Sequence, residues 1–308
     1  MRLVAALLGC GALVAAVRGE DACLAESCPV TANAFADDEF MVCNVGSSCR
    51  DEYNEANGTE HEIWPAAALS LARRRLEAER NRVMLNEYQP SIAPKFTEVG
   101  YKKEKLDPET YKALLVWYTR EFEHSEPEVE VWPEDNTYVN HWKVDTAMTR
   151  SPRYIQNLLF DELLPEMEEW SGIKLESTSC YGVRHYYRGA ILANHVDRVD
   201  THVISGIINV EQENVDTPWP LYVRGHDGVA RKLFIEPGEI IFYESASVIH
   251  GRPEAFEGDR FANIFVHFTP QTGWDLTAFD VRAAASEGDR KKRREARMVR
   301  PPQAPEVA

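Results

Sequence analysis

The C-terminal half contains a series of short segments rich in β-branched and aromatic residues, and this pattern restricts the fold more than any other feature. Turn-forming stretches separate several of them, including Gly-His-Asp-Gly at 225–228, Pro-Gly at 237–238 and Glu-Gly-Asp at 257–259. Short strands interrupted in this way are typical of a β-sandwich or barrel. The expected strands are 179–187, 202–210, 221–224, 232–235, 239–243 and 260–268.

The preceding region, 62–175, carries helical signals instead. Residues 66–88 are rich in Ala, Leu, Arg and Glu, and residues 154–170 repeat apolar residues on one helix face. Asp107 followed by Pro108 predicts a helix start, with Asp as N-cap. We therefore expect an α+β fold, in which a helical N-terminal part precedes a double-stranded β-helix (jelly-roll) catalytic core at 176–272.

The first 19 residues predict a secretory signal peptide. Met1-Arg2 is a short basic start, residues 3–17 are almost wholly apolar, and a cleavage site is expected after Gly19. The alternative is an uncleaved anchor, but the run is shorter than the roughly 20 apolar residues of a spanning helix. The expected location is the secretory pathway (ER or Golgi lumen) or the extracellular space.

Cysteine usage agrees with an oxidising compartment. Cys23, Cys28, Cys43 and Cys49 crowd into a segment at 20–61, where two disulfides are expected and the pairing stays open. Zinc is the alternative, although these spacings lack the usual close pairs. Asn57 begins an Asn-Gly-Thr glycosylation acceptor.

The net charge of −16 argues against nucleic acid as a partner, because phosphate binding needs a basic surface. Removing residues 1–19, which hold Arg2, Arg18 and no acid, takes it to −18. A basic run at 290–294 lies in a polar segment, 282–308, for which a solvated, disordered tail is expected. No stable membrane span is expected after the signal, and the oligomeric state stays open.

Two histidines and one aspartate stand out as candidate metal ligands. His195 and Asp197 follow an apolar strand pattern, and in an extended chain residues i and i+2 share a face. His250 follows the apolar stretch 240–243 by a few residues. Two His and one carboxylate form the facial triad that leaves iron positions open for a 2-oxo acid and dioxygen. A closed structural zinc site would need a fourth protein ligand.

Arg260 lies ten positions after His250 and begins an expected strand. On that strand it shares a face with Ala262, Ile264 and Val266. A guanidinium beside an apolar face suggests a buried anionic partner that it binds bidentately. The alternative is an exposed arginine paired with Asp259 or Glu257.

The stretch 181–270 resembles the prolyl 4-hydroxylase-type branch of the iron(II) and 2-oxoglutarate dioxygenases. In that family the first iron-binding His begins a His-x-Asp triplet. A Tyr lies nine positions before this His and a Gly lies six positions before it; here these residues are Tyr186 and Gly189. A Pro-Gly turn, an apolar strand, a His-x-x-Pro element and a Gly-x-basic element follow at 237–260. The chain departs from the family in Leu192 and Phe261, where relatives carry an aromatic residue and Trp, and in having Arg260 for the usual Lys.

The resemblance implies that His195, Asp197 and His250 bind Fe(II) and carry the reaction. It implies that Arg260 holds the distal carboxylate of 2-oxoglutarate, with Tyr186 supporting it by a hydrogen bond. The implied activity is hydroxylation of a carbon of a protein substrate, with peptidyl proline as one candidate, using O2 and releasing succinate and CO2. L-ascorbate is implied as an accessory reductant, and the substrate, polypeptide or small molecule, is otherwise open.

Two other functions remain to be weighed. One is a non-catalytic jelly-roll metal-binding protein, which would have no use for an anion anchor beside the metal. The other is a metal-dependent hydrolase, which would not depend on 2-oxoglutarate. The Trp219-Pro220 pair is either part of a lid or a turn with a packed indole. Glu244 is either a partner of a metal-binding His or a loop carboxylate.

Overall fold

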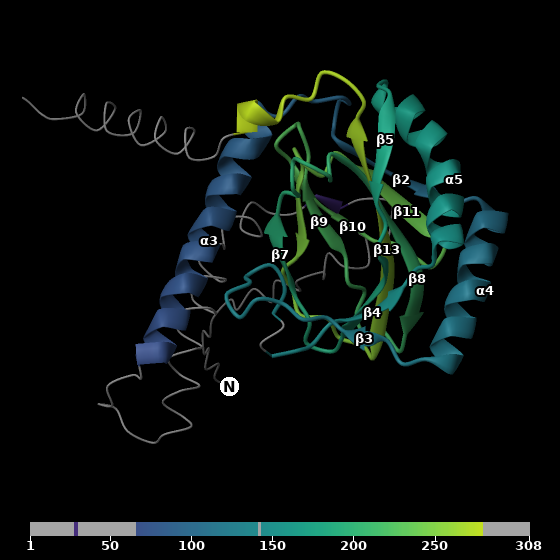
Figure 1. The fold of residues 1–308 in the computed structure, drawn as a ribbon, viewed down its shortest axis with the longest axis horizontal. Helices are drawn as coiled ribbons and strands as arrows, with labels where there is room; N and C mark the ends of the chain where they lie inside the picture. The colour runs from purple at the N-terminus through teal and green to yellow at the C-terminus, as the bar shows by residue number, and fades with distance from the viewer. Residues whose placement is uncertain (1–27, 30–65, 141–142, 280–308) are drawn as a thin grey trace, which may run out of the picture.

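The computed structural model describes residues 28–29, 66–140 and 143–279 (Figure 1). The expected signal peptide, most of the cysteine-rich segment including its disulfides, Asn57 and the basic tail lie outside the described residues. Two antiparallel sheets face each other and form the core. Three long helices accompany them: α3 (Ala66–Ile92), α4 (Pro108–His124) and α5 (Arg153–Ser171).

The larger sheet has the order β2-β11-β8-β13-β6-β4-β3, with β5 also paired to β13. Its strands are β2 (Tyr101–Lys105), β3 (Glu128–Val129), β4 (Ala147–Arg150), β5 (Leu175–Ser179), β6 (Gly182–Tyr187), β8 (Ile204–Glu213), β11 (Glu239–Tyr243) and β13 (Arg260–Pro270).

The smaller sheet has the order β1-β10-β9-β12-β7. Its strands are β1 (Cys28–Pro29), β7 (Leu192–His195), β9 (Leu221–Arg224), β10 (Ala230–Leu233) and β12 (Ile249–Arg252). From β6 to β13 the chain passes repeatedly from one sheet to the other, which is the connectivity of a double-stranded β-helix. The expected α+β fold with a jelly-roll core is confirmed.

One expected strand, 179–187, is two strands in the structure. The break falls at Cys180 and Tyr181, and β6 begins at Gly182, whose φ of +147° is accessible to glycine alone among common residues. A Cβ atom at this position would collide with the backbone oxygen of Thr149 on the neighbouring β4. The close approach of β4 and β6 therefore requires glycine here.

Helices α4 and α5 cover the outer face of the larger sheet (Figure 1). The Asp107 side chain accepts hydrogen bonds from the backbone N–H groups of Glu109 and Thr110 at 3.0 and 2.9 Å, so the expected N-cap of α4 is confirmed. Both helices bury one apolar face against alternate strand residues. The shared core includes Leu114, Trp117, Ile155, Leu159, Leu163, Met167, Ile208, Ile240, Ile264 and Val266.

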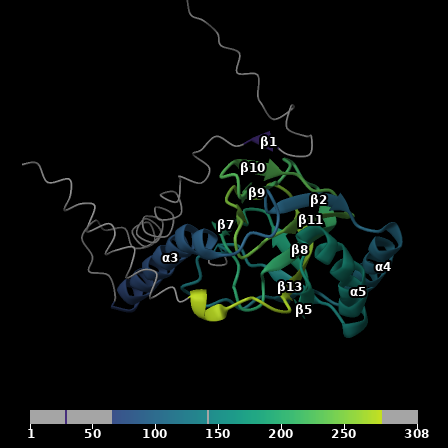
Figure 2. The same ribbon diagram turned by 90° about the horizontal axis from the view of Figure 1, so that it is seen from above.

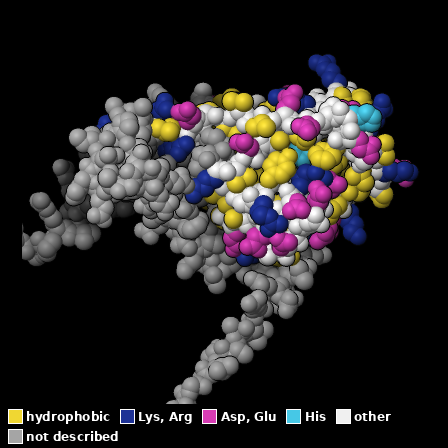
Figure 3. Space-filling model, turned by 90° about the horizontal axis from the view of Figure 1, so that it is seen from below, with side chains coloured by type: hydrophobic (Ala, Val, Ile, Leu, Met, Phe, Trp, Pro, Cys, Tyr) yellow, Lys and Arg dark blue, Asp and Glu magenta, His cyan; other side chains and the backbone are white. Residues whose placement is uncertain are grey.

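Helix α3 lies apart from the other two, alongside β7 of the smaller sheet, in both views of the ribbon (Figures 1 and 2). Of the described helices, none has the length and apolar character needed to cross a membrane. On the face of the molecule seen in Figure 3, acidic and basic side chains are interspersed among apolar ones, without a continuous basic area.

His185 on β6 makes the stability of the fold sensitive to acid. It is fully buried between the rings of Tyr118 and Phe122, and its Nε2 lies 2.9 Å from Thr149 Oγ1. Burial, reinforced by the positive charge of Arg260, lowers the pKa of His185 to about 4. The unfolded chain, with a histidine pKa of about 6.5, therefore binds more protons than the folded chain between these pH values.

We expect the free energy of unfolding to fall as pH decreases from about 6.5 to about 4, by at most ~1.4 kcal/mol per pH unit from this group. In His185→Gln the free energy of unfolding should depend less on pH, because a neutral amide cannot be protonated. Urea unfolding of both proteins at pH 7 and pH 5 measures it. Parallel pH profiles for the two proteins would contradict the assignment.

Candidate metal centre and cosubstrate pocket

The three predicted metal ligands meet at one edge of the smaller sheet. His195 is the last residue of β7, and Asp197 follows two positions later in the loop. His250 lies on β12, which pairs with β7 so that His250 and His195 are register partners. The pairing of two strands more than fifty residues apart in sequence therefore brings the ligands together.

The donor atoms converge. Asp197 Oδ1 lies 3.4 Å from His195 Nε2 and 3.6 Å from His250 Nε2, and all three ligand atoms lie within 4.8 Å of one another. Each imidazole directs its other nitrogen at a backbone carbonyl: His195 Nδ1 at Ala193 O, 2.7 Å away, and His250 Nδ1 at Val248 O, 2.9 Å away. Donation from Nδ1 fixes the tautomer that leaves Nε2 as a ligand.

The electrostatics of the group favour metal-binding protonation states. Burial raises the pKa of Asp197, but the two neighbouring imidazoles outweigh it and hold the pKa well below its usual range. Burial and the neighbouring His250 lower the pKa of His195. One carboxylate and two imidazoles on one side of a cavity are the donor set of non-haem Fe(II).

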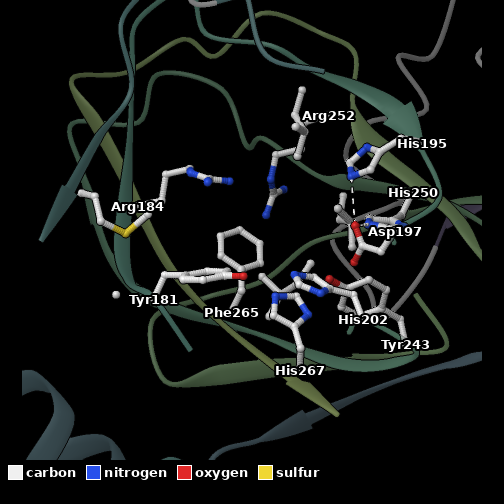
Figure 4. A pocket seen from close by; sticks show the side chains of 15 residues that line it. Tyr181, Arg184, His195, Asp197, His202, Tyr243, His250, Arg252, Phe265 and His267 are labelled. Atoms are coloured by element: carbon white, nitrogen blue, oxygen red, sulfur yellow. Dashed lines mark ion pairs between the residues drawn. The ribbon is translucent and has the colours of Figure 1, made fainter. Parts of the chain in front are cut away.

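A cavity of about 120 Å³ opens beside the three ligands, inside the barrel (Figure 4). Its wall comes from both sheets. Beside the ligands, the lining includes Met148, Tyr181, Arg184, His202, Tyr243, Arg252, Phe265 and His267. In the close view, the guanidinium groups of Arg184 and Arg252 both point into this space from the side opposite His202 and His267 (Figure 4).

Arg252 places a buried guanidinium in the wall of this cavity. Its side chain is buried, at 2% exposure, between the rings of Trp219 and Phe261. Nη1 donates to Trp219 O at 2.7 Å, whereas Nη2 has no hydrogen-bond partner among the described residues. Burial lowers the pKa of Arg252 to about 10, and no described carboxylate pairs with it. A buried, unpaired guanidinium is costly unless a ligand supplies the anion.

Arg260, the residue expected to hold 2-oxoglutarate, lies on the other face of β13. It pairs with Glu211 and Glu213 at 2.7 and 2.9 Å and stacks 4.0 Å from the centre of the Phe122 ring on α4. The apolar face that it shares with Ala262 packs under the helices rather than lining the barrel. Arg260 was expected to have a buried anionic partner, but the side chains of Glu211 and Glu213 are 38% and 46% exposed, and Arg260 is not among the residues that line the cavity.

Tyr186 does lie inside the barrel, as expected. It is fully buried on β6 with its ring against Trp219. Its hydroxyl raises the pKa of both Arg184 and Arg252, opposing the effect of burial, so it lies near both guanidinium groups. This place suits a residue that supports an anion bound at Arg252.

Sequence reasoning missed Arg252, although a signal was available. Arg252 is two residues after His250 on the same strand, which is the spacing that linked His195 to Asp197. Arg184 was also missed; Glu130 already pairs with it bidentately, at 2.7 and 2.9 Å. Of the two guanidinium groups that line the cavity, Arg252 is therefore the one with an unused donor.

His202 and His267 are both buried and also line the cavity. Their rings are tilted against each other with centroids 3.7 Å apart, and Ser205 Oγ lies 2.7 Å from His267 Nδ1. Burial, with the charge of neighbouring groups, lowers the pKa of His267 to about 3. They form a neutral, polar wall next to the metal ligands.

Two open alternatives are decided by the structure. Glu244 accepts hydrogen bonds from the N–H groups of Phe96 and Thr97, at 2.9 and 2.7 Å, and is not the partner of a metal-binding His. Trp219 is a packed indole, 4% exposed, rather than part of a lid.

The strand order and the His-Asp-His group together give this chain the fold of the 2-oxoglutarate and iron(II) oxygenases, and it resembles their prolyl 4-hydroxylase branch. Neither a scan against protein-family models nor a search of curated proteins found a match.

Several solved structures are similar. A prolyl-4-hydroxylase from Pseudomonas putida has 17% identity and a TM-score of 0.44, with 61% of this chain and 100% of that chain covered. A prolyl hydroxylase from Trichoplax adhaerens, in complex with a hypoxia inducible factor peptide, has 13% identity and a TM-score of 0.40, covering 68% and 94%. HygX from Streptomyces hygroscopicus, with nickel and 2-oxoglutarate bound, has 10% identity and a TM-score of 0.41, covering 56% and 84%.

Proposed function

We propose that this protein is an iron(II)- and 2-oxoglutarate-dependent dioxygenase that hydroxylates a carbon of a polypeptide substrate, with peptidyl proline as the first candidate. The observation that carries the proposal is the presence of two complementary features in one cavity. A three-donor metal group lines one side, and Arg252, a buried guanidinium with an unused N–H donor, lines the other.

The position of each residue in the cavity indicates its role. His195, Asp197 and His250 would hold the metal, and Arg252 would hold the distal carboxylate of the oxo acid by charge-assisted hydrogen bonds. Tyr186 lies near that guanidinium and would support the same carboxylate. When bound, iron and the oxo acid supply the oxidising chemistry, while the protein provides ligation, orientation and a dry cavity.

The same features argue against the two rivals. A non-catalytic metal-binding protein has no need of an uncompensated guanidinium in the metal cavity. A metal-dependent hydrolase would not depend on 2-oxoglutarate and so does not account for the same guanidinium.

The choice of a polypeptide substrate is supported by an aromatic residue on the cavity wall. Tyr181, half exposed on the cavity wall, offers an aromatic surface on which a prolyl ring can pack. Action in the secretory pathway, and ascorbate as accessory reductant, are parts of the proposal that follow from the sequence alone.

The test is an anaerobic titration of the iron(II)-loaded protein with 2-oxoglutarate, followed by visible absorption. We expect a metal-to-ligand charge-transfer band in the wild type, because chelation by the oxo acid requires open positions on the metal. His195→Ala should lose the band. His124→Ala, at an exposed position of α4, is the matched control and should keep it.

A folded, iron-loaded wild type without the band would refute the dioxygenase. Metal binding without any response to 2-oxoglutarate would favour the hydrolase or the non-catalytic metal-binding protein.

A further inference from the structure

Helix α3 has an unusual buried face, because the buried side chains that the structure describes on it are polar. Arg75, Glu79, Arg82, Asn86 and Gln89 are all at most 9% exposed. Their spacings of four, three, four and three residues place them on one stripe of the helix, where a soluble helix normally carries apolar residues. The docking of α3 therefore depends on hydrogen bonds along this stripe.

The C-terminal part of the stripe binds backbone carbonyl groups around the metal ligands. Arg82 Nη1 and Asn86 Nδ2 both donate to the carbonyl of Asn194, the latter at 2.9 Å. Gln89 Nε2 donates to the carbonyl of Asp197 at 2.6 Å and to that of Ala246 at 2.9 Å. Asn194 immediately precedes one metal ligand, and Asp197 is itself another.

The topology explains why these carbonyls need partners. β7, which ends at His195, is the last strand in the order of the smaller sheet, so one side of it lacks a neighbouring strand. The Asp197 loop has left the sheet altogether. On this side of β7, Ala193 N–H donates to the Tyr138 carbonyl at 2.7 Å, and Leu192 forms a bridge with Val139. An exposed strand edge needs cover. At Asn194, past this bridge, side chains of α3 supply the hydrogen-bond donors.

We propose that Asn86 and Gln89 are positioning residues for the metal centre. By fixing the carbonyls of residues 194 and 197, they fix the backbone on both sides of His195 and hold Asp197 beside it. The inference rests on the proposed metal site, but it concerns ligand geometry rather than the reaction. Helix α3 thereby determines how tightly the protein binds the metal.

The test compares cobalt(II) affinity in variants of the full chain, using the visible absorption of the bound ion. Asn86→Leu and Gln89→Met keep approximate size and remove the donor. We expect each to weaken cobalt(II) binding by about tenfold, at the lower end of the effect of removing partners of metal ligands. The visible spectrum should also change, because it depends on ligand geometry.

Two controls separate positioning from general stability. Asn81→Leu makes the same change on the exposed side of α3 and should leave cobalt(II) affinity unchanged. Ile155→Val loosens the core under α5, far from the site, and should lower stability without altering cobalt(II) affinity. Gln89→Ala repeats the test without an apolar group opposite two carbonyls, should Gln89→Met not fold.

Wild-type affinity and spectrum in folded Asn86 and Gln89 variants would overturn the positioning role while leaving the metal site intact. Wild-type protein that binds no cobalt(II) or iron(II) would instead overturn the metal site, and the positioning role with it.

Discussion

Replacing Arg252 with methionine is expected to weaken 2-oxoglutarate binding by about 2–5 kcal/mol, the usual cost of truncating one partner of a buried, hydrogen-bonded charge pair. The methionine fills the space between Trp219 and Phe261 but leaves the distal carboxylate of the oxo acid without a cation. The measurement is the midpoint of the anaerobic charge-transfer titration, with the iron affinity determined separately.

Arg260→Met is the matched control, because it makes the same substitution ten residues from His250, where the sequence alone had placed the anchor. Arg260 binds Glu211 and Glu213 on the helix-covered face, so this variant should keep wild-type affinity for 2-oxoglutarate. The reverse result, with Arg260→Met impaired and Arg252→Met unaffected, would show that the anion site has been assigned to the wrong arginine.

Removing Glu79 is expected to destabilise the protein by about 3–5 kcal/mol, because it breaks a buried ion pair from one side. Glu79 and Arg82 are 0% and 1% exposed, and Arg82 Nε donates to Glu79 Oε2 at 2.8 Å. In Glu79→Ala the guanidinium keeps its contact with the Asn194 carbonyl but loses its counter-charge. Urea unfolding at pH 7 measures the loss.

The double variant Glu79→Leu/Arg82→Met distinguishes charge burial from loss of packing. Replacing both charges by apolar side chains of similar size should recover most of the stability. It should bind the metal more weakly than the wild type, because the Asn194 carbonyl has lost one of its donors. A double variant as unstable as Glu79→Ala would mean that the ion pair itself is not the source of the effect.

The sequence was sufficient for the fold, and it identified the three residues that the structure brings together as a possible metal group. Residues 221–224 and 239–243 were expected as strands and are strands with those bounds. The spacing of His195 and Asp197 placed them on one side of an extended chain, and the structure brings them together with His250. Spacing along the chain predicts the structure where the residues concerned follow the period of a strand.

The sequence was not sufficient where the role of a residue depends on what its face of the strand or helix packs against. Alternation along β13 correctly grouped Arg260 with Ala262 and Ile264, but it could not say whether that face meets the barrel interior or the helices. The role of α3 could not be predicted either. Arg82, Asn86 and Gln89 are polar, and polar residues on a helix are expected to face solvent. Only the packed structure shows that they bind backbone carbonyls.

The way in which α3 binds the ligand loop also bears on how this site can diversify. A carbonyl oxygen is the same whichever residue carries it, so the contacts to residues 194, 197 and 246 place no constraint on neighbouring side chains. Arg198 and Asp200, exposed just beyond the ligand, can then vary while the backbone that holds the metal keeps its course. Helix α3 thus keeps the backbone of the metal site fixed while these positions are varied. Libraries of variants at these positions can be selected for new substrate preferences without redesigning the catalytic centre.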